Sequence, residues 1–570
     1  MVAAVVFGAI VLRVVQLQTI GASELRAAGR DQRTTQLTLQ AQRGVVFDRN
    51  GDELAMSIPS TTVTANPKLV ADPGGTVQVL AQLLDLSPEK QEALREAFTL
   101  KEKGFVYVAR QISAEDAAAL RELDLNGVDL VAEDKRIMPT GEVGRSVIGR
   151  TDPDGAGTAG IELQYDDLLT GVDGEMVRQH DRRGRSLVGT ETTSIDPVPG
   201  QDIVLTLDRS VQHVVEQEML QQVRSLSARG GTAVVLESKT GDVISMVSVR
   251  RNDETGEYAV SSGNLAAVDA AEPGSVVKAA TIAAALNEGV VTADTPFEVP
   301  WRKQYSDTML HDAEQHPTEV WPVSRILAES SNIGTIEVML RMGDSRGERK
   351  ERLHSYLKAF GLGEPTALAF PGESAGLMKD WREWEGAEQY TMAYGQGLAS
   401  TSVQLAAAIN VIANGGVYVA PRLLQATIGP DGTITDAPSS ATHRVVRDEV
   451  AAEVTRMMEK VVCVGTARRA QVEGLSVAGK TGTGLKAQPN GTYYNERGER
   501  TYYASFVGFF PAEDPQVTVL VSIDEPPGAD GQLTRFGGTA AAPVFASVVP
   551  TIMRELKITP PATGGGCDEG

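Results

Sequence analysis

Residues 272–287 read Glu-Pro-Gly-Ser-Val-Val-Lys-Ala-Ala-Thr-Ile-Ala-Ala-Ala-Leu-Asn, and they predict a helix that begins near Ser275. Pro273 and Gly274 end the preceding loop, and the mostly apolar residues that follow are expected to be buried. Ser275 and Lys278 lie about one helical turn apart, where a neutral lysine can take the proton of a serine hydroxyl. A lysine in such surroundings either extends its charge to the surface or has a lowered pKa. Only the second case suits catalysis.

The same Ser-x-x-Lys spacing also occurs from Ser87 to Lys90. Pro88 follows at the first expected helical position, and Glu89 and Arg95 keep this helix polar. Ser87 is therefore expected to cap a helix and not to act as a nucleophile.

Two further short patterns each occur twice. Ser-x-Asn is found from Ser262 to Asn264, in a polar loop, and from Ser330 to Asn332, after an apolar helical run. Lys-Thr-Gly is found at 239–241, where a hairpin turn needs a glycine. It recurs at 480–482, on an expected strand edge where alternating threonines can hydrogen-bond an extended ligand. Taken singly, each pattern is also explained by local structure.

Residues 474–481 also fit the phosphate-loop pattern G-x-x-x-x-G-K-[ST]. Such a loop binds phosphate only when a helix begins at its Gly-Lys pair, because the helix amides then face the anion. Gly482, Gly484 and Pro489 follow, so no helix is expected there. Nucleotide binding is kept as the least supported alternative.

The length of 570 residues suggests about two to four domains. Asn50-Gly51 predicts a hairpin within 37–57, and helices are expected over 77–100. Residues 139–200 are rich in Gly and Asp and predict extended linker with small strands. After a boundary at 197–200 the strands come in runs, which predicts a mainly antiparallel sheet flanked by helices. These strands are expected at 202–207, 232–237, 242–249, 475–478, 503–509 and 517–523, and the helices at 210–225, 275–287, 323–342, 403–414 and 448–469.

The first 18 residues are apolar except for Arg13, Gln16 and Gln18, and their length is near the lower limit for a membrane-spanning helix. A signal peptide is the alternative, but no basic residue precedes the stretch and no clear cleavage pattern ends it. The basic residues follow the stretch, which would place the bulk of the chain in the cytoplasm if Met1 were the native start. We hypothesise a longer native N-terminus whose own basic residues reverse this orientation.

The net charge of −22 repels phosphate backbones, so nucleic-acid binding is not expected. The two cysteines, Cys463 and Cys567, are too few for a disulfide framework or a four-thiolate zinc site, and they leave the redox compartment undecided. His311 and His316 flank Asp312 and Glu314, but no further ligands cluster with them. A polar loop is expected there and not a metal site.

The patterns occur in the order Ser-x-x-Lys, Ser-x-Asn, Lys-Thr-Gly within one expected domain only at Ser275, Ser330 and Lys480. This set is shared by penicillin-binding proteins and serine β-lactamases. The chain resembles a class B penicillin-binding protein over everything except its tail. Residues 43–51, 136–141 and 160–162 are similar to signatures of the family's pedestal, and residues 272–275, 394–397, 401–404 and 413–416 are similar to its transpeptidase pattern. The short loops, without a zinc-bearing insertion or PASTA repeats, resemble the septal, FtsI-like enzymes most.

The resemblance implies an α+β multidomain chain. It places a transmembrane anchor at 1–18, an elongated, mostly-β pedestal or dimerisation domain at 19–195, a transpeptidase domain at 200–555 and a disordered tail at 556–570. It also implies a single-pass protein of the cell membrane with its catalytic domain outside the cytoplasm.

The resemblance implies a peptidoglycan D,D-transpeptidase that works through an acyl-serine, without cofactor or metal. Ser275 is the implied nucleophile, Lys278 the general base and Ser330 the proton relay. Substrate binding is assigned to Asn332, Lys480, Thr481, Gly482 and Thr483, and the oxyanion hole to the backbone N–H groups of Ser275 and Thr483. The implied partners are D-Ala-D-Ala stem peptides, β-lactam antibiotics, a membrane-embedded glycosyltransferase of the FtsW type and other divisome proteins.

Three alternatives from the same motifs stay open. An elongation-type class B penicillin-binding protein shares the whole pattern. A β-lactamase or β-lactam sensor shares the three motifs but does not need residues 19–195 as a pedestal. A catalytically silent scaffold would have lost a catalytic residue, and none is missing.

Overall fold

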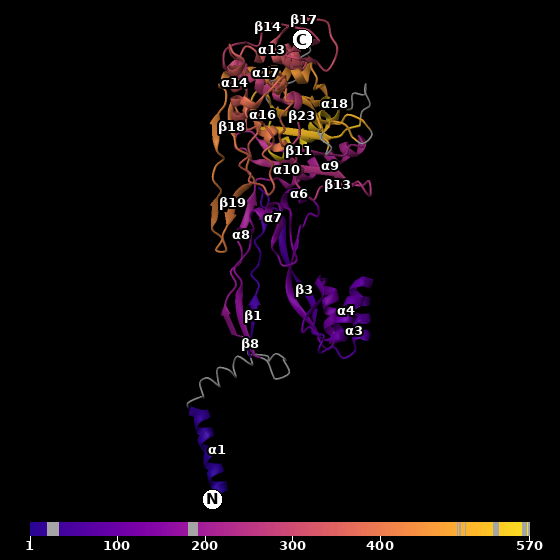
Figure 1. Cartoon of the computed structure of the whole chain (residues 1–570), viewed down its shortest axis with the longest axis vertical. Helices are drawn as coiled ribbons and strands as arrows, with labels where there is room; N and C mark the ends of the chain where they lie inside the picture. The colour runs from indigo at the N-terminus through magenta and orange to yellow at the C-terminus, as the bar shows by residue number, and fades with distance from the viewer. Residues whose placement is uncertain are drawn as a thin grey trace.

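The computed structural model describes residues 1–19, 34–179, 192–486, 488, 492–495, 498–527, 535–560 and 567. Figure 1 shows an elongated molecule with a large domain at the C-terminal end, a narrow stalk of strands and a side lobe that carries α3 and α4. The apolar stretch predicted at 1–18 forms α1, Val2–Thr19. Among the described residues, no helix combines the length and the apolar character required to cross a membrane. The anchor stays a prediction.

Strands from the N-terminal part of the chain form the stalk and the side lobe, and β3 belongs to both. The predicted hairpin at Asn50-Gly51 is confirmed, because β2 pairs antiparallel with β3 across this turn. β3 then continues into the lobe, where it pairs with β4 on one side and β5 on the other. The bounds are β1 Thr34–Leu39, β2 Val46–Phe47, β3 Glu53–Ala65, β4 Val106–Ile112, β5 Val128–Ile137, β8 Gly174–Gln179 and β9 Thr192–Ile195.

Three helices complete the lobe: α3 Pro73–Leu84, α4 Pro88–Leu100 and α5 Ala114–Leu123. Val63 of β3 packs with Val77, Leu80 and Phe98 in a separate small core. The helices expected over 77–100 are confirmed, with a break between α3 and α4. Ser87 caps α4 by accepting a hydrogen bond from the Lys90 N–H, as expected for this decoy serine.

The region 139–200 differs from its prediction, because it contains three short helices beside its small strands. These elements are α6 Arg145–Ile148, β6 Arg150–Thr151, β7 Gly157–Ala159, α7 Gly160–Gln164 and α8 Asp166–Leu169. Helices of four or five residues are too short to show a helical periodicity in the sequence. Ion pairs hold α7 and α8 in place. Arg43 binds Glu162 at 2.8 Å and Asp166 at 2.7 Å, and Arg136 binds the other oxygen of Glu162 at 2.7 Å.

The large domain is organised around a six-stranded, wholly antiparallel sheet in the order β13-β12-β11-β24-β23-β22, which confirms the predicted sheet type. A second sheet reaches from this domain into the stalk, because β10 pairs with β2 on one side and β19 on the other. The strands of the domain are β10 Asp202–Leu205, β11 Gly230–Glu237, β12 Val243–Arg251, β13 Tyr258–Val260, β14 Pro296–Val299, β15 Arg302–Tyr305, β16 Thr308–His311, β17 Glu319–Pro322, β18 Val417–Val419, β19 Leu424–Ile428, β20 Ile434–Asp436, β21 Thr442–Arg444, β22 Ala478–Leu485, β23 Tyr502–Phe510 and β24 Val517–Asp524.

Helices cover both faces of the six-stranded sheet. A Cβ at Gly231 of β11 would meet Met219 of α9, whereas the next residue, Thr232, hydrogen-bonds to Ser402 at the start of α16. Successive strand residues face opposite sides, so α9 and α16 lie on opposite faces. The helices are α9 Arg209–Ser225, α10 Leu265–Val268, η1 Gly274–Val277, α11 Lys278–Asn287, α12 Val323–Ala328, α13 Asn332–Met339, α14 Arg346–Ala359, η2 Trp381–Glu383, α15 Glu388–Met392, α16 Ser402–Ala413, α17 Asp448–Cys463, η3 Arg468–Ala470, α18 Gly537–Ala540 and α19 Ala542–Glu555.

Three expected elements of this domain have different bounds. The helix expected over 323–342 is two helices, α12 and α13, separated at Ser330, whose φ of 61° is left-handed. The strand expected at 475–478 begins where that range ends and extends to Leu485. The helix expected over 448–469 ends at Cys463. α14 and α19 were not anticipated.

The tail predicted to be disordered over 556–570 falls mostly outside the described residues. Its residue Cys567 is described and forms a disulfide with Cys463, at the end of α17. A pairing across 104 residues of sequence could not be read from spacing alone.

Candidate active site

Ser275 lies in the short helix η1, which continues directly into α11 with Lys278 as its first residue. Gly274 has a φ of 56°, and its N–H donates to the carbonyl of Gly395 at 3.0 Å. A Cβ at Gly395 would lie 2.1 Å from the Gly274 carbonyl, so both positions require glycine. This close approach fixes the turn that presents Ser275, whose side chain is half-buried, while Lys278 is fully buried.

Ser330 occupies the break between α12 and α13, and two lysines hold its hydroxyl. Lys480 Nζ lies 2.8 Å and Lys278 Nζ 3.3 Å from Ser330 Oγ, and Lys278 also donates to the Ser330 carbonyl. These bonds stabilise a strained backbone conformation that a serine adopts only where its surroundings impose it. The structure therefore brings Lys278, Ser330 and Lys480 together, although they come from three separate motifs.

Within the described part of the chain, no hydrogen bond joins Lys278 to Ser275. Such bonds are often loose without a ligand and tighten when the reacting complex forms. The one-turn spacing predicted from Ser-x-x-Lys still places both residues at the same end of the buried helix.

Lys480, Thr481, Gly482 and Thr483 lie on β22, the edge strand of the six-stranded sheet. In an antiparallel pair, the backbone groups of every second residue bond the neighbouring strand. The Lys486 N–H donates to the Thr501 carbonyl, so Gly484 and Gly482 are the next residues whose backbone groups bond β23. The backbone groups of Thr481 and Thr483 therefore face the free edge. The Thr483 N–H, which was predicted to form part of the oxyanion hole, is therefore available there for an oxyanion or an added strand.

The face of β22 toward which Gly482 and Gly484 would point their side chains packs tightly against the nucleophile segment. A Cβ at Gly482 would lie 2.8 Å from the Pro273 carbonyl, and a Cβ at Gly484 would lie 1.8 Å from the Glu272 carbonyl. Only glycine permits this approach of backbone to backbone, which explains why Gly482 and Gly484 alternate with the threonines.

Both buried lysines have lowered pKa values. Burial lowers the pKa of Lys278 to about 7, against a smaller raising effect of Asp312. Burial, followed by the charge of Lys278, also lowers the pKa of Lys480 well below its usual range. Two ammonium groups on one buried hydroxyl repel each other, so near neutral pH this pair can hold one neutral amine.

Asn332 begins α13, and its side-chain amide donates to the carbonyl of His311 at 2.9 Å. Asp312 accepts from the Ser331 hydroxyl at 2.7 Å and from the Ile333 N–H at 2.9 Å, while His316 lies 2.9 Å from its carboxylate. His316 also stacks on Trp321. Asp312, its partner His316 and the His311 carbonyl thus fix the start of α13 beside Ser330.

Sequence patterns did not reveal two other contributors to the site. Thr466, in the turn after α17, hydrogen-bonds to Thr481 at 2.8 Å between hydroxyl oxygens. Gly465 packs so closely that a Cβ there would lie 2.4 Å from the Ala328 carbonyl, two residues before Ser330. The turn thus supports two sides of the site, and no motif in the sequence marks it.

The decoy patterns lie where local structure explains them. Lys239-Thr240-Gly241 forms the turn between β11 and β12, and Ser262 lies in the loop after β13. Gly479 and Lys480 lie inside a strand and not at a helix N-terminus, so the phosphate-loop interpretation is wrong.

Comparison with family models matches residues 231–550 to the penicillin-binding protein transpeptidase domain and residues 38–205 to the penicillin-binding protein dimerisation domain. The first match alone covers more than half of the chain. The chain belongs to the penicillin-binding protein family. The fold and the three motifs described above are therefore those of a penicillin-binding protein.

Named relatives agree with this assignment. The chain is 32% identical to the probable peptidoglycan D,D-transpeptidase PenA of Neisseria meningitidis, over 98% of this chain and 92% of the relative. It is 31% identical to the peptidoglycan D,D-transpeptidase FtsI of Escherichia coli, over 97% and 90%. The structure is similar to penicillin-binding protein 3 of Mycobacterium tuberculosis complexed with aztreonam, with a TM-score of 0.68 and 28% identity, over 93% of this chain and 99% of that chain.

Proposed function

We propose that this penicillin-binding protein is a peptidoglycan D,D-transpeptidase that cross-links stem peptides through an acyl-enzyme on Ser275. One observation carries the proposal. Lys278 and Lys480 both hydrogen-bond the Ser330 hydroxyl, and this group lies beside Ser275 and the free edge of β22. A buried amine with a pKa near neutrality is the group that a weakly acidic serine hydroxyl requires as a base.

The reaction follows from these positions. Neutral Lys278 takes the Ser275 proton while Oγ attacks the carbonyl of the penultimate D-Ala. The N–H groups of Ser275 and Thr483 stabilise the negative oxygen that forms. Ser330, which bonds both lysines, passes a proton to the departing amine of the terminal D-Ala. The amine of a second stem peptide then attacks the acyl carbon, loses its proton along the same route and releases Ser275.

Substrate recognition is assigned to the groups around this centre. A peptide lying along the free edge of β22 pairs with the outward backbone groups of Thr481 and Thr483. Lys480 and the threonine hydroxyls face its terminal carboxylate. Asn332, at the start of α13, binds a peptide amide from the other side.

The pH profile of acylation should report Lys278. Only neutral Lys278 accepts the proton, so the rate should rise as the pH increases through about 7 and level off above that value. With an ordinary lysine, the rise would continue at roughly tenfold per pH unit beyond pH 9. The second-order rate constant for labelling by a fluorescent penicillin, measured between about pH 5.5 and 9.5, distinguishes the two profiles.

Intact mass after exposure to penicillin tests the proposed function directly. The full chain should gain the mass of one drug molecule and keep it for many minutes after free drug is removed, and it should clear no more than one equivalent of a chromogenic cephalosporin. A β-lactamase needs a free base to activate water. Here Asp312 is occupied by Ser331, Ile333 and His316. Steady turnover of the cephalosporin would reassign the protein to β-lactam hydrolysis.

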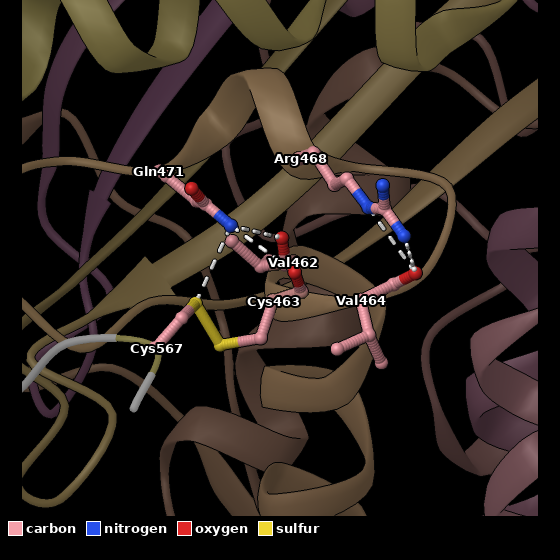
Figure 2. The surroundings of a disulfide bond; sticks show 6 residues. All are labelled: Val462, Cys463, Val464, Arg468, Gln471 and Cys567. Carbon is pink, nitrogen blue, oxygen red and sulfur yellow. Dashed lines mark hydrogen bonds between the residues drawn. A yellow bond between two sulfur atoms is a disulfide. The ribbon is translucent and has the colours of Figure 1, made fainter. Parts of the chain in front are cut away.

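We propose a membrane-anchored protein with its catalytic domain outside the cytoplasm. The disulfide between Cys463 and Cys567, shown in Figure 2, supports this location, because such bonds persist mainly in oxidising compartments. A septal role with an FtsW-type glycosyltransferase and other divisome partners is part of the proposal, with an elongation role as the alternative. The domain limits 1–18, 19–195, 200–555 and 556–570 also stay proposals.

A further inference from the structure

Glu272, three residues before Ser275, hydrogen-bonds to segments on both sides of the nucleophile. Its Oε1 atom accepts from the hydroxyl of Tyr493 at 3.0 Å and from the N–H of Gly397 at 3.3 Å. The backbone amide of Leu485, at the end of β22, also stabilises the carboxylate. One side chain thus links the nucleophile segment, the 394–397 loop and β22.

The backbone around Glu272 is also closely packed. Gly484 lies against the Glu272 carbonyl, and Gly274 lies against both Gly395 and Thr483, where a Cβ on Gly274 would meet the Thr483 carbonyl at 2.8 Å. The oxyanion hole assigned above joins the N–H of Ser275 to that of Thr483. Leu485 is the next residue along β22 whose backbone faces the same edge as Thr483.

The other carboxylate oxygen, Oε2, is buried without a hydrogen-bond partner, and Glu272 is one of the residues that line a cavity of about 30 Å³. Ser400 also lines this cavity, and its side chain is 5% exposed. Among the described residues no lysine or arginine pairs with Glu272, and burial raises the pKa of its carboxyl. A half-buried carboxylate without a cation lowers the stability of the fold. We therefore expect the hydrogen bonds of Glu272 to have a role other than stability.

We propose that Glu272 is a positioning residue for acyl transfer, which sets the spacing between the Ser275 and Thr483 N–H groups from behind the nucleophile. Its carboxylate is the common acceptor that holds β22, through the Leu485 amide, and the 394–397 loop, through the Gly397 amide, at a fixed distance from Ser275. This inference rests on the proposed function, because it assumes that the two N–H groups stabilise an oxyanion.

The test compares three substitutions of Glu272 in the full chain. Glu272→Ala removes the acceptor, and Glu272→Asp withdraws it by one methylene. Each should lower the first-order acylation rate constant for penicillin by about 100-fold, the cost expected when a reacting group is misplaced by about 1 Å. Glu272→Gln keeps an oxygen at the Oε1 position and should stay within about threefold of the unchanged protein. The dissociation constant of the initial non-covalent complex should change little in all three.

Ser400→Ala is the matched control, because it alters the same cavity without touching β22, and its acylation rate should equal that of the unchanged protein. Active-site titration and thermal unfolding of each variant correct for misfolded material. A slow Asp variant beside a fast Gln variant, with normal titration, supports the inference. Equal rates for Ala, Asp and Gln, or a loss explained by the inactive fraction, overturn it. If the unchanged protein itself forms no penicilloyl adduct, the proposed function fails and the inference fails with it.

Discussion

Ser275→Ala should abolish covalent labelling by a fluorescent penicillin. The substitution removes the only hydroxyl that is presented at the start of the buried helix beside Lys278 among the residues described here. Removing the nucleophile of a covalent mechanism leaves no acyl-enzyme to detect, whatever the binding affinity. The measurement is in-gel fluorescence after incubation with the labelled drug, with the unchanged protein on the same gel.

Ser87→Ala provides the matched control, because Ser87 and Lys90 have the same Ser-x-x-Lys spacing in the side lobe. Ser87 accepts the Lys90 N–H as a helix cap, so its loss should cost about 1 kcal/mol of stability and leave labelling intact. Labelling that persists in the Ser275 variant would remove Ser275 from the mechanism. Labelling that disappears in the Ser87 variant would show that the spacing alone does not identify the nucleophile.

Much of this site was predictable, because its motifs encode local structure. The Ser-x-x-Lys pattern needs only a helical turn, and Lys-Thr-Gly needs only a strand edge, so Ser275, Lys278 and Lys480 could be placed from the sequence. The hairpin at Asn50-Gly51 was predictable for the same reason, since its turn chemistry lies in adjacent residues.

The parts that were missed depend on contacts between distant segments. The run 323–342 reads as one helix, and the break at Ser330 is stabilised by Lys278 and Lys480, which lie 52 and 150 residues away. The short helices α7 and α8 depend on Arg43, whose partners Glu162 and Asp166 are 119 and 123 residues away. Helix propensity and periodicity carry no information on such pairings.

Loss of the Cys463–Cys567 disulfide should strongly lower the free energy of unfolding. The bond closes a loop across 104 residues, and this loop includes β22, β23, β24 and α19. Constraining a loop of about 100 residues in the unfolded chain contributes about 4–5 kcal/mol in the loop-entropy model. Cys463→Ala combined with Cys567→Ala should therefore unfold at a clearly lower denaturant concentration than the oxidised protein.

The same change should alter acylation far less than it alters stability, although the turn after Cys463 supports Thr481. Figure 2 shows that side-chain hydrogen bonds also hold this turn, and that Gln471 bonds the Cys567 sulfur as well. Gln471 donates to the carbonyls of Val462 and Cys463, and Arg468 donates to that of Val464. These bonds satisfy the last carbonyls of α17, which would otherwise be unpaired.

The decisive comparison is the full chain with and without reductant, beside the double cysteine variant treated in the same way. Reductant should shift the unfolding midpoint of the unchanged protein to that of the variant, and it should not affect the variant. Penicillin acylation at a temperature where both are folded should differ by less than about threefold, because the hydrogen bonds of the turn remain. Equal midpoints for oxidised and reduced protein would show that the tail adds nothing to the fold. A large loss of acylation with an unchanged midpoint would instead mean that the disulfide, and not Gln471 and Arg468, positions the turn that supports Thr481.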